Sequence, residues 1–93
     1  MEQRIKTIDI IAKQWFDKNN GNSYFAAIVT INYKLEGENI LKLPFQYGYG
    51  DYYYYAAIEL VKKEYQIDSL EDIIIRRNIQ RGCKKRDLKN FVL

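Results

Sequence analysis

Histidine is absent from this 93-residue chain, and cysteine, proline and tryptophan each occur once. Without histidine, catalytic dyads and triads lack the base whose pKa lies nearest to neutrality. Zinc and iron sites lose their commonest ligand for the same reason. Two pairs of carboxylates occur in predicted turns or connectors: Glu36 with Glu38, and Glu71 with Asp72. We expect water to solvate these carboxylates, so they lack the burial that would shift their pKa values toward those of catalytic acids or bases. The sequence therefore predicts a non-enzymatic protein with no cofactor and no metal site.

Cys83 is the single cysteine, so no disulfide can form within the chain, which suits a reducing compartment. The positive residues that follow it would stabilise a thiolate. No base and no second cysteine accompanies it, and we interpret Cys83 as a residue without a catalytic role.

Long hydrophobic runs are also missing. Apolar runs such as residues 24–29 are far too short to cross a bilayer, and no apolar signal segment occurs near the N-terminus. We therefore expect a cytoplasmic protein that does not bind membranes. Hydrophobic residues make up 47% of the chain and charged residues 29%, which is typical of an ordered globular protein. This length predicts a single domain over residues 1–93.

Basic residues are concentrated near the C-terminus. Residues 1–72 contain eight basic and eleven acidic side chains, whereas residues 73–93 contain seven basic and one acidic. A segment of this sign can contact phosphates or an acidic protein surface, or it can be a solvated edge.

Three β-strands are predicted in the first half of the chain. β-branched residues favour a strand over residues 5–16, and Asn20-Gly21 indicates a tight turn into a second strand over residues 23–33. Alternation in that strand directs one set inward: Phe25, Ala27, Val29, Ile31 and Tyr33. A third strand over residues 40–47 is predicted to share one face among Leu41, Leu43, Phe45 and Tyr47. Pro44 lacks an N–H donor, which indicates a sheet edge or a bulge.

A helix is predicted from Asp51, as its N-cap, to about residue 65. Its inward residues recur at three- and four-residue spacing: Tyr54, Ala57, Ile58, Val61 and Tyr65. Residues 70–82 fit either a strand or a helix, and the three consecutive isoleucines favour a strand. The last ten residues fit a helical turn or an extended segment anchored by Leu88 and Phe91. The predicted fold class is α+β in the order β-β-β-α-β, an antiparallel three- to four-stranded sheet with one helix packed on a face.

The segment PFQYGYGDYYYY, residues 44–55, is the most unusual part of the sequence. Successive helical residues are separated by about 100°, so four consecutive tyrosines point around the whole helix and some must be exposed. Exposed tyrosine is enriched at protein interfaces, although an aromatic corner with its hydroxyls in water is an equal alternative. The candidate partner-binding residues are Tyr47, Tyr49, Tyr52, Tyr53 and Tyr55.

Three segments carry a resemblance to a known group of proteins: WFDKNNGNSYF at residues 15–25, PFQYGYGDYYY at 44–54 and KKRDLKN at 84–90. Together they resemble small, mostly uncharacterised accessory proteins of tailed bacteriophages. The resemblance implies a phage origin, an accessory role and a location in the cytoplasm of the host cell, and it transfers no functional residue. The run of four tyrosines departs from the pattern, since such proteins tend to have more polar residues there.

Two functions follow as hypotheses. The first is a protein that binds and modulates a host or anti-phage defence protein through the tyrosines, or that forms a homodimer. The second is a protein that binds single-stranded or duplex nucleic acid. Its basic side chains would contact phosphates, and its aromatic rings would stack on unpaired nucleobases. The candidate residues for nucleic acid are Arg76, Arg77, Arg81, Lys84, Lys85, Arg86 and Lys89.

Overall fold

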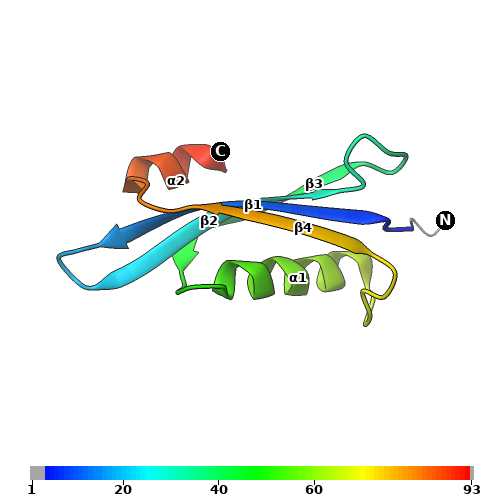
Figure 1. Ribbon diagram of the computed structural model, residues 1–93, viewed down its shortest axis with the longest axis horizontal. Coiled ribbons are helices and arrows are strands. Elements are labelled where there is room, and N and C mark those ends of the chain that lie inside the picture. The colour runs from blue at the N-terminus through cyan, green and yellow to red at the C-terminus, as the bar shows by residue number, and fades with distance from the viewer. Residues whose placement is uncertain (1–3, 93) are drawn as a thin grey trace.

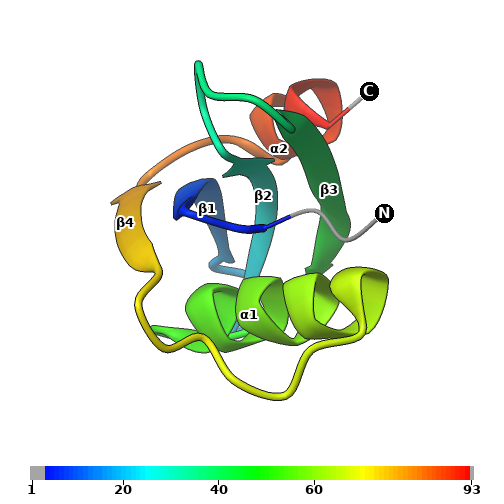
Figure 2. The ribbon, with the colours of Figure 1, turned by 90° about the vertical axis from the view of Figure 1, so that its right-hand side faces the viewer.

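The computed structural model describes residues 4–92 and shows a four-stranded sheet between two helices (Figure 1). The elements in chain order are β1 (Thr7–Asp17), β2 (Asn22–Ile31), β3 (Asn39–Tyr47), α1 (Tyr52–Tyr65), β4 (Ile74–Gln80) and α2 (Lys85–Phe91). The strand order across the sheet is β3-β2-β1-β4. Figure 2 shows α1 on one face of the curved sheet, α2 on the other, and β3 and β4 at opposite edges.

The α+β class is confirmed, but the sheet is mixed rather than antiparallel. β1 pairs antiparallel with β2, and β2 with β3, whereas β4 pairs parallel with β1. The 14 residues of α1 span roughly 21 Å, enough to carry the chain back along the sheet before β4 begins. β4 therefore runs in the same direction as β3 and β1. The segment 70–82 does contain a strand, and the C-terminal segment forms a second helix that the predicted order lacked.

A turn between β1 and β2 forms where Asn20-Gly21 predicts one, but its loop has four residues, 18–21, between the paired Asp17 and Asn22. Gly21 has φ +70°, and its N–H donates to the carbonyl of Asp17 at 2.7 Å. The Asp17 carboxylate accepts from the backbone N–H of Asn19 and the side-chain amide of Asn20. The turn fixes the register, which places Trp15 opposite Tyr24.

A bulge in β3 overturns the predicted face of two aromatic residues. Phe25 pairs with Gln46 and Ala27 with Leu43, so two steps along β2 match three along β3, beside Pro44. One extra residue reverses the alternation of a strand. Leu41 and Leu43 therefore pack on the α1 side, but Phe45 and Tyr47 lie on the α2 side, where both contact Tyr24. The expectation for Pro44, an edge or a bulge, is confirmed in both respects.

The main core lies between α1 and the sheet. Four residues of α1 are buried: Tyr53, Ala57, Ile58 and Val61. They pack against buried isoleucines of β1 and β2 and against Val29 of β2. Tyr54 and Tyr65, predicted to be core residues, are partly buried and pack against the same cluster. Asp51 precedes the helix but makes no side-chain cap, and the first helical N–H groups bond to main-chain carbonyls instead.

Two expectations about the end of the second strand are wrong: its last residue and the inward position of Tyr33. The second strand ends at Ile31, where Asn32 takes φ +52° and is buried, and Tyr33 is 50% exposed rather than inward. Gly48, the residue after β3, has a steric role. A Cβ there would lie 2.7 Å from ring atoms of Phe25 and Tyr52. Glycine at residue 48 therefore lets β3 approach the buried ring of Phe25.

Candidate functional site

The tyrosines of residues 47–55 are largely exposed, as the helical geometry predicts. The exposed fractions are 53% for Tyr47, 48% for Tyr49, 50% for Tyr52 and 63% for Tyr55. Tyr53, by contrast, is 3% exposed and belongs to the core between α1 and the sheet. Tyr53 is therefore wrong as a partner-binding residue, because its ring is not accessible at the surface.

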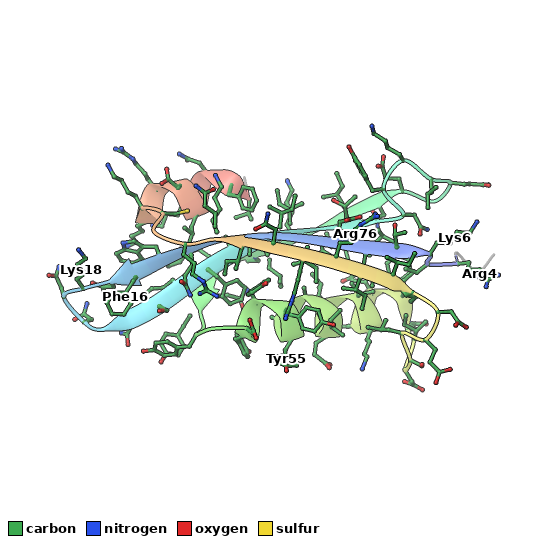
Figure 3. The ribbon with its side chains drawn as sticks, viewed as in Figure 1. Arg4, Lys6, Phe16, Lys18, Tyr55 and Arg76 are labelled. Carbon is green, nitrogen blue, oxygen red and sulfur yellow. The ribbon has the colours of Figure 1, made fainter. Side chains whose placement is uncertain are left out.

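The exposed tyrosines do not form one group. Tyr47 and Tyr49 contact each other, with ring centroids 5.2 Å apart. Tyr52 contacts the core residue Phe25, and Tyr55 contacts Tyr54 on the α1 side of the sheet, below the strands in Figure 3. Of these tyrosines, Tyr47 and Tyr49 are connected to further rings on the α2 side, because Tyr47 also contacts Tyr24.

Those contacts form a row of rings across three strands. Trp15 of β1 stacks on Tyr24 of β2 with centroids 5.4 Å apart, and Tyr24 stacks on Phe45 of β3 at 5.0 Å. Tyr24 also meets Tyr47 edge to face at 5.9 Å. Hairpin register and the β3 bulge together bring these four rings to the same end of the sheet. The row is an aromatic surface, partly covered and partly open.

Helix α2 lies over this row and brings cations to it. Leu88 is fully buried and anchors α2, whose residues contact β1, β2 and β3. The Lys85 ammonium lies 5.7 Å from the Trp15 ring centroid and 5.9 Å from that of Phe45, and Lys89 lies 5.7 Å from Phe45. Such distances allow cation–π attraction. We call this surface the aromatic-lysine face: Trp15, Tyr24, Phe45, Tyr47, Lys85 and Lys89.

The seven basic residues predicted as nucleic-acid contacts are only partly brought together. Lys84, Lys85, Arg86 and Lys89 belong to α2 or its first flanking residue. Arg81 donates to the Gln14 side chain at 3.0 Å. The two arginines of β4 lie on opposite faces of the sheet. Arg76 forms a bidentate ion pair with Asp9, and Arg77 lies 4.5 Å from the Tyr54 ring.

Charge is distributed unevenly between the two helical layers. Residues 51–72, which include α1, contain six acidic and two basic side chains, whereas residues 84–89 contain four basic and one acidic. The one acid, Asp87, accepts a hydrogen bond from the backbone N–H of Lys84 at 2.9 Å, within the first turn of α2. The α2 side of the sheet is therefore the side that attracts anions.

Hydrogen bonds shift the pKa values of three ionisable groups near these surfaces. The hydrogen bond with Asn20 lowers the pKa of Asp17, and the nearby charge of Lys85 contributes in the same direction. A hydrogen bond with Tyr49 raises the pKa of Tyr47, and the ion pair with Asp9 raises the pKa of Arg76. At neutral pH Asp17 is thus ionised and Tyr47 carries its proton.

Cys83 lies between β4 and α2, partly buried, and its thiol donates to the Gln80 carbonyl at 3.5 Å. Within residues 4–92, no three His, Cys, Asp or Glu side chains gather in a metal-binding arrangement. Over the same range, no helix is long and apolar enough to cross a membrane.

Comparisons with known proteins found no match: no family model, no curated protein and no solved structure is significantly similar to this chain. The resemblance to bacteriophage accessory proteins therefore stays a prediction.

Sequence reasoning did not identify Trp15, Tyr24 and Phe45 as site residues. Asn20-Gly21 indicated the hairpin, but a two-residue turn at this dipeptide would place Trp15 opposite Ala26, so the observed pairing of Trp15 with Tyr24 was not predictable from it. Phe45 could not have been found by alternation, since the bulge beside Pro44 changes its face. The position of α2 over these rings depends on Leu88, which the sequence indicated only as an anchor.

Proposed function

We propose that this protein is a non-enzymatic binding protein that takes single-stranded nucleic acid on its aromatic-lysine face. The observation that carries the proposal is the position of Lys85 and Lys89, whose ammonium groups lie 5.7 to 5.9 Å from the rings of Trp15 and Phe45. Proteins that bind single strands combine cations, which contact phosphates, with rings on which unpaired bases stack. Here both kinds of group lie on one surface.

The open rings at the edge of this face suit unpaired bases. Tyr47 and Tyr49 are about half exposed at the end of β3, and Tyr47 continues through Tyr24 to the rings below α2. A base stacks on such a ring only when its own face is free, as in a single strand.

Duplex recognition is less well supported. α2 has seven residues and lies against the sheet through Leu88, instead of projecting as a helix that enters a major groove. We therefore propose a single strand as the ligand in preference to a duplex.

We expect a labelled oligo-dT to bind at low salt, with an affinity that falls steeply as salt rises. Lys85→Glu combined with Lys89→Glu should weaken binding at least tenfold and reduce the slope of log affinity against log salt by about 1.4, since each phosphate contact in a single strand contributes about 0.7. Fluorescence anisotropy at several salt concentrations measures both quantities.

The matched control is Lys62→Glu combined with Lys63→Glu, which makes the same charge change in the last turn of α1, on the other side of the sheet. This variant should bind like the wild type. No binding of oligo-dT at low salt, or equal losses in the two double variants, would contradict the proposal.

A second candidate function is supported by the exposed tyrosines outside this face. Tyr52 and Tyr55 are 50% and 63% exposed near the start of α1. Large exposed rings of this kind are used at protein interfaces. In this candidate the chain is a phage accessory protein that binds a host or anti-phage defence protein, or a second copy of itself. The β3 edge is a weaker docking site, because Pro44 lacks an N–H and the bulge interrupts the ladder.

For this candidate, we expect Tyr52→Ser combined with Tyr55→Ser to abolish partner capture in a pull-down from host lysate, because the variant removes the rings but leaves the core Tyr53 intact. Self-association would instead give a mass of twice 11.1 kDa in light scattering after size exclusion. Tyr47→Ser is the control and should leave capture unchanged. A monomer that captures no protein speaks against this candidate.

A further inference from the structure

β1 continues beyond the end of its neighbour β4. The parallel pairing of the two strands ends at Lys13 with Gln80, and one further bond joins the Cys83 N–H to the Gln14 carbonyl at 3.0 Å. Between Gln80 and Cys83 the chain turns at Gly82, which has φ +77°, and α2 begins at Lys85. The last residues of β1 are therefore paired with β2 but have no strand on their outer side.

A cavity of about 510 Å³ occupies this position. Trp15, Phe16 and Lys18 line it from β1 and the hairpin, and Cys83 and Lys84 line it from the connection to α2. Figure 3 shows Phe16 and Lys18 at the hairpin end of the sheet. Because Trp15 also belongs to the aromatic-lysine face, the cavity and that face share a wall.

The backbone of β1 offers polar groups to the cavity. Alternate residues of a strand direct their N–H and C=O groups to opposite sides. The Gln14 carbonyl points toward the β4 side, where it accepts from Cys83. The N–H and C=O of Phe16, two residues on, point to the same side, past the last residue of β4. A donor and an acceptor beside each other form the pattern that a base edge can pair with.

The side chains around the cavity fit the rest of a nucleotide. Neighbouring residues of a strand direct their side chains to opposite faces, so Trp15 and Phe16 flank the open edge from both sides. Phe16 is 48% exposed. Lys18 and Lys84 are exposed lining residues that can reach a phosphate outside the cavity. The negative group in the lining, Asp17, is held in the hairpin turn by its bonds to Asn19 and Asn20.

We infer that this cavity takes one unpaired nucleobase of the strand bound on the aromatic-lysine face. The inference rests on the proposed binding of single-stranded nucleic acid and adds the place where a base leaves the strand. The base lies beside Trp15 and Phe16, its edge pairs with the backbone of Phe16, and its phosphate contacts Lys84.

The chain's single cysteine and single tryptophan both line the cavity, so each reports on it. The experiment measures the rate at which iodoacetamide alkylates Cys83, by mass spectrometry, with AMP, UMP, ribose 5-phosphate or inorganic phosphate present. We expect AMP or UMP to slow alkylation about fivefold or more at saturation and to change the Trp15 emission. Ribose 5-phosphate and inorganic phosphate, which lack a base, should do neither.

Two variants test the position of the base. Phe16→Ser should abolish protection of Cys83, and the exposure of Phe16 means that folding should be retained. Ile11→Ser is the control, because Ile11 is 52% exposed on the same strand but outside the cavity lining, and protection should persist.

The outcomes separate this inference from the proposed function. If ribose 5-phosphate protects Cys83 as well as AMP does, the cavity is an anion site and the inference is wrong. If oligo-dT binds through Lys85 and Lys89 while neither it nor any mononucleotide protects Cys83, the inference is wrong and the proposed function stands. If oligo-dT does not bind at all, the proposed function fails, and protection by AMP or UMP alone then decides whether the cavity takes a base.

Discussion

Replacing Asn32 with alanine should lower the free energy of unfolding by about 3 kcal/mol or more, because this side chain satisfies three backbone groups at once. Asn32 is 1% exposed. Its Oδ1 accepts from the N–H groups of Lys6 at 2.7 Å and Thr7 at 3.3 Å, and its Nδ2 donates to the Arg4 carbonyl at 2.9 Å. Alanine removes these partners and also tolerates the positive φ less well than asparagine.

Urea unfolding followed by circular dichroism measures this loss, and two further variants divide it. Asn32→Gly removes the same hydrogen bonds but accepts φ +52° without strain, so it should be less destabilising than alanine. Lys34→Ala is the matched control, since Lys34 has φ +58° but is exposed and bonds through its backbone N–H, which alanine keeps. Its effect should be within about 0.5 kcal/mol of zero. An Asn32→Ala variant as stable as the wild type would show that these bonds do not hold the start of β1.

Asn32 also shows where sequence reasoning reaches its limit. Alternation in residues 23–33 predicts an outward Asn32 and an inward Tyr33, and both are wrong because the strand ends at Ile31. Alternation describes a strand only while the strand lasts. The bonds from Asn32 reach residues 4–7, more than twenty positions away, and no local pattern indicates them.

The parts of the fold that depend on local chemistry were predictable. Asn20-Gly21 indicates the hairpin, although not its register, and the apolar spacing of residues 57–61 identifies the inward side of α1. The direction of β4 was not predictable in the same way, because it depends on how far α1 carries the chain across the sheet. A parallel edge strand and an antiparallel one have the same isoleucine-rich pattern.

In the candidate site, too, the features that depend on local geometry were predictable and those that depend on tertiary packing were not. Helical geometry correctly predicts that some of the four consecutive tyrosines are exposed, as Tyr52 and Tyr55 are. The choice of Tyr53 as a surface residue was wrong, although Tyr53, Ala57 and Val61 follow at four-residue intervals and could have indicated a buried row. The meeting of Lys85 and Lys89 with rings from three strands is a tertiary feature, which the sequence shows only as a basic tail and scattered aromatics.

Replacing Leu88 with alanine should abolish most of the oligonucleotide binding, because Leu88 is the fully buried residue that anchors α2 to the sheet. A seven-residue helix is too short to be stable in water without tertiary packing. Removing the buried side chain should cost about 2–5 kcal/mol. The loss falls first on the docking of α2, which releases Lys85 and Lys89 from the rings of Trp15 and Phe45. We expect at least a tenfold weaker affinity for oligo-dT and a shift in Trp15 emission.

Ile58→Ala separates this effect from a general loss of stability. Ile58 is 8% exposed on the α1 side of the sheet, and its truncation should cost a similar free energy of unfolding, about 2–5 kcal/mol. The aromatic-lysine face lies on the opposite side, so Ile58→Ala should bind oligo-dT like the wild type as long as it remains folded at the assay temperature. Anisotropy measurements on both variants, below their unfolding midpoints, decide the question. If Leu88→Ala binds as tightly as Ile58→Ala, then α2 does not present the lysines that bind the strand, and the ligand contacts another surface of the sheet.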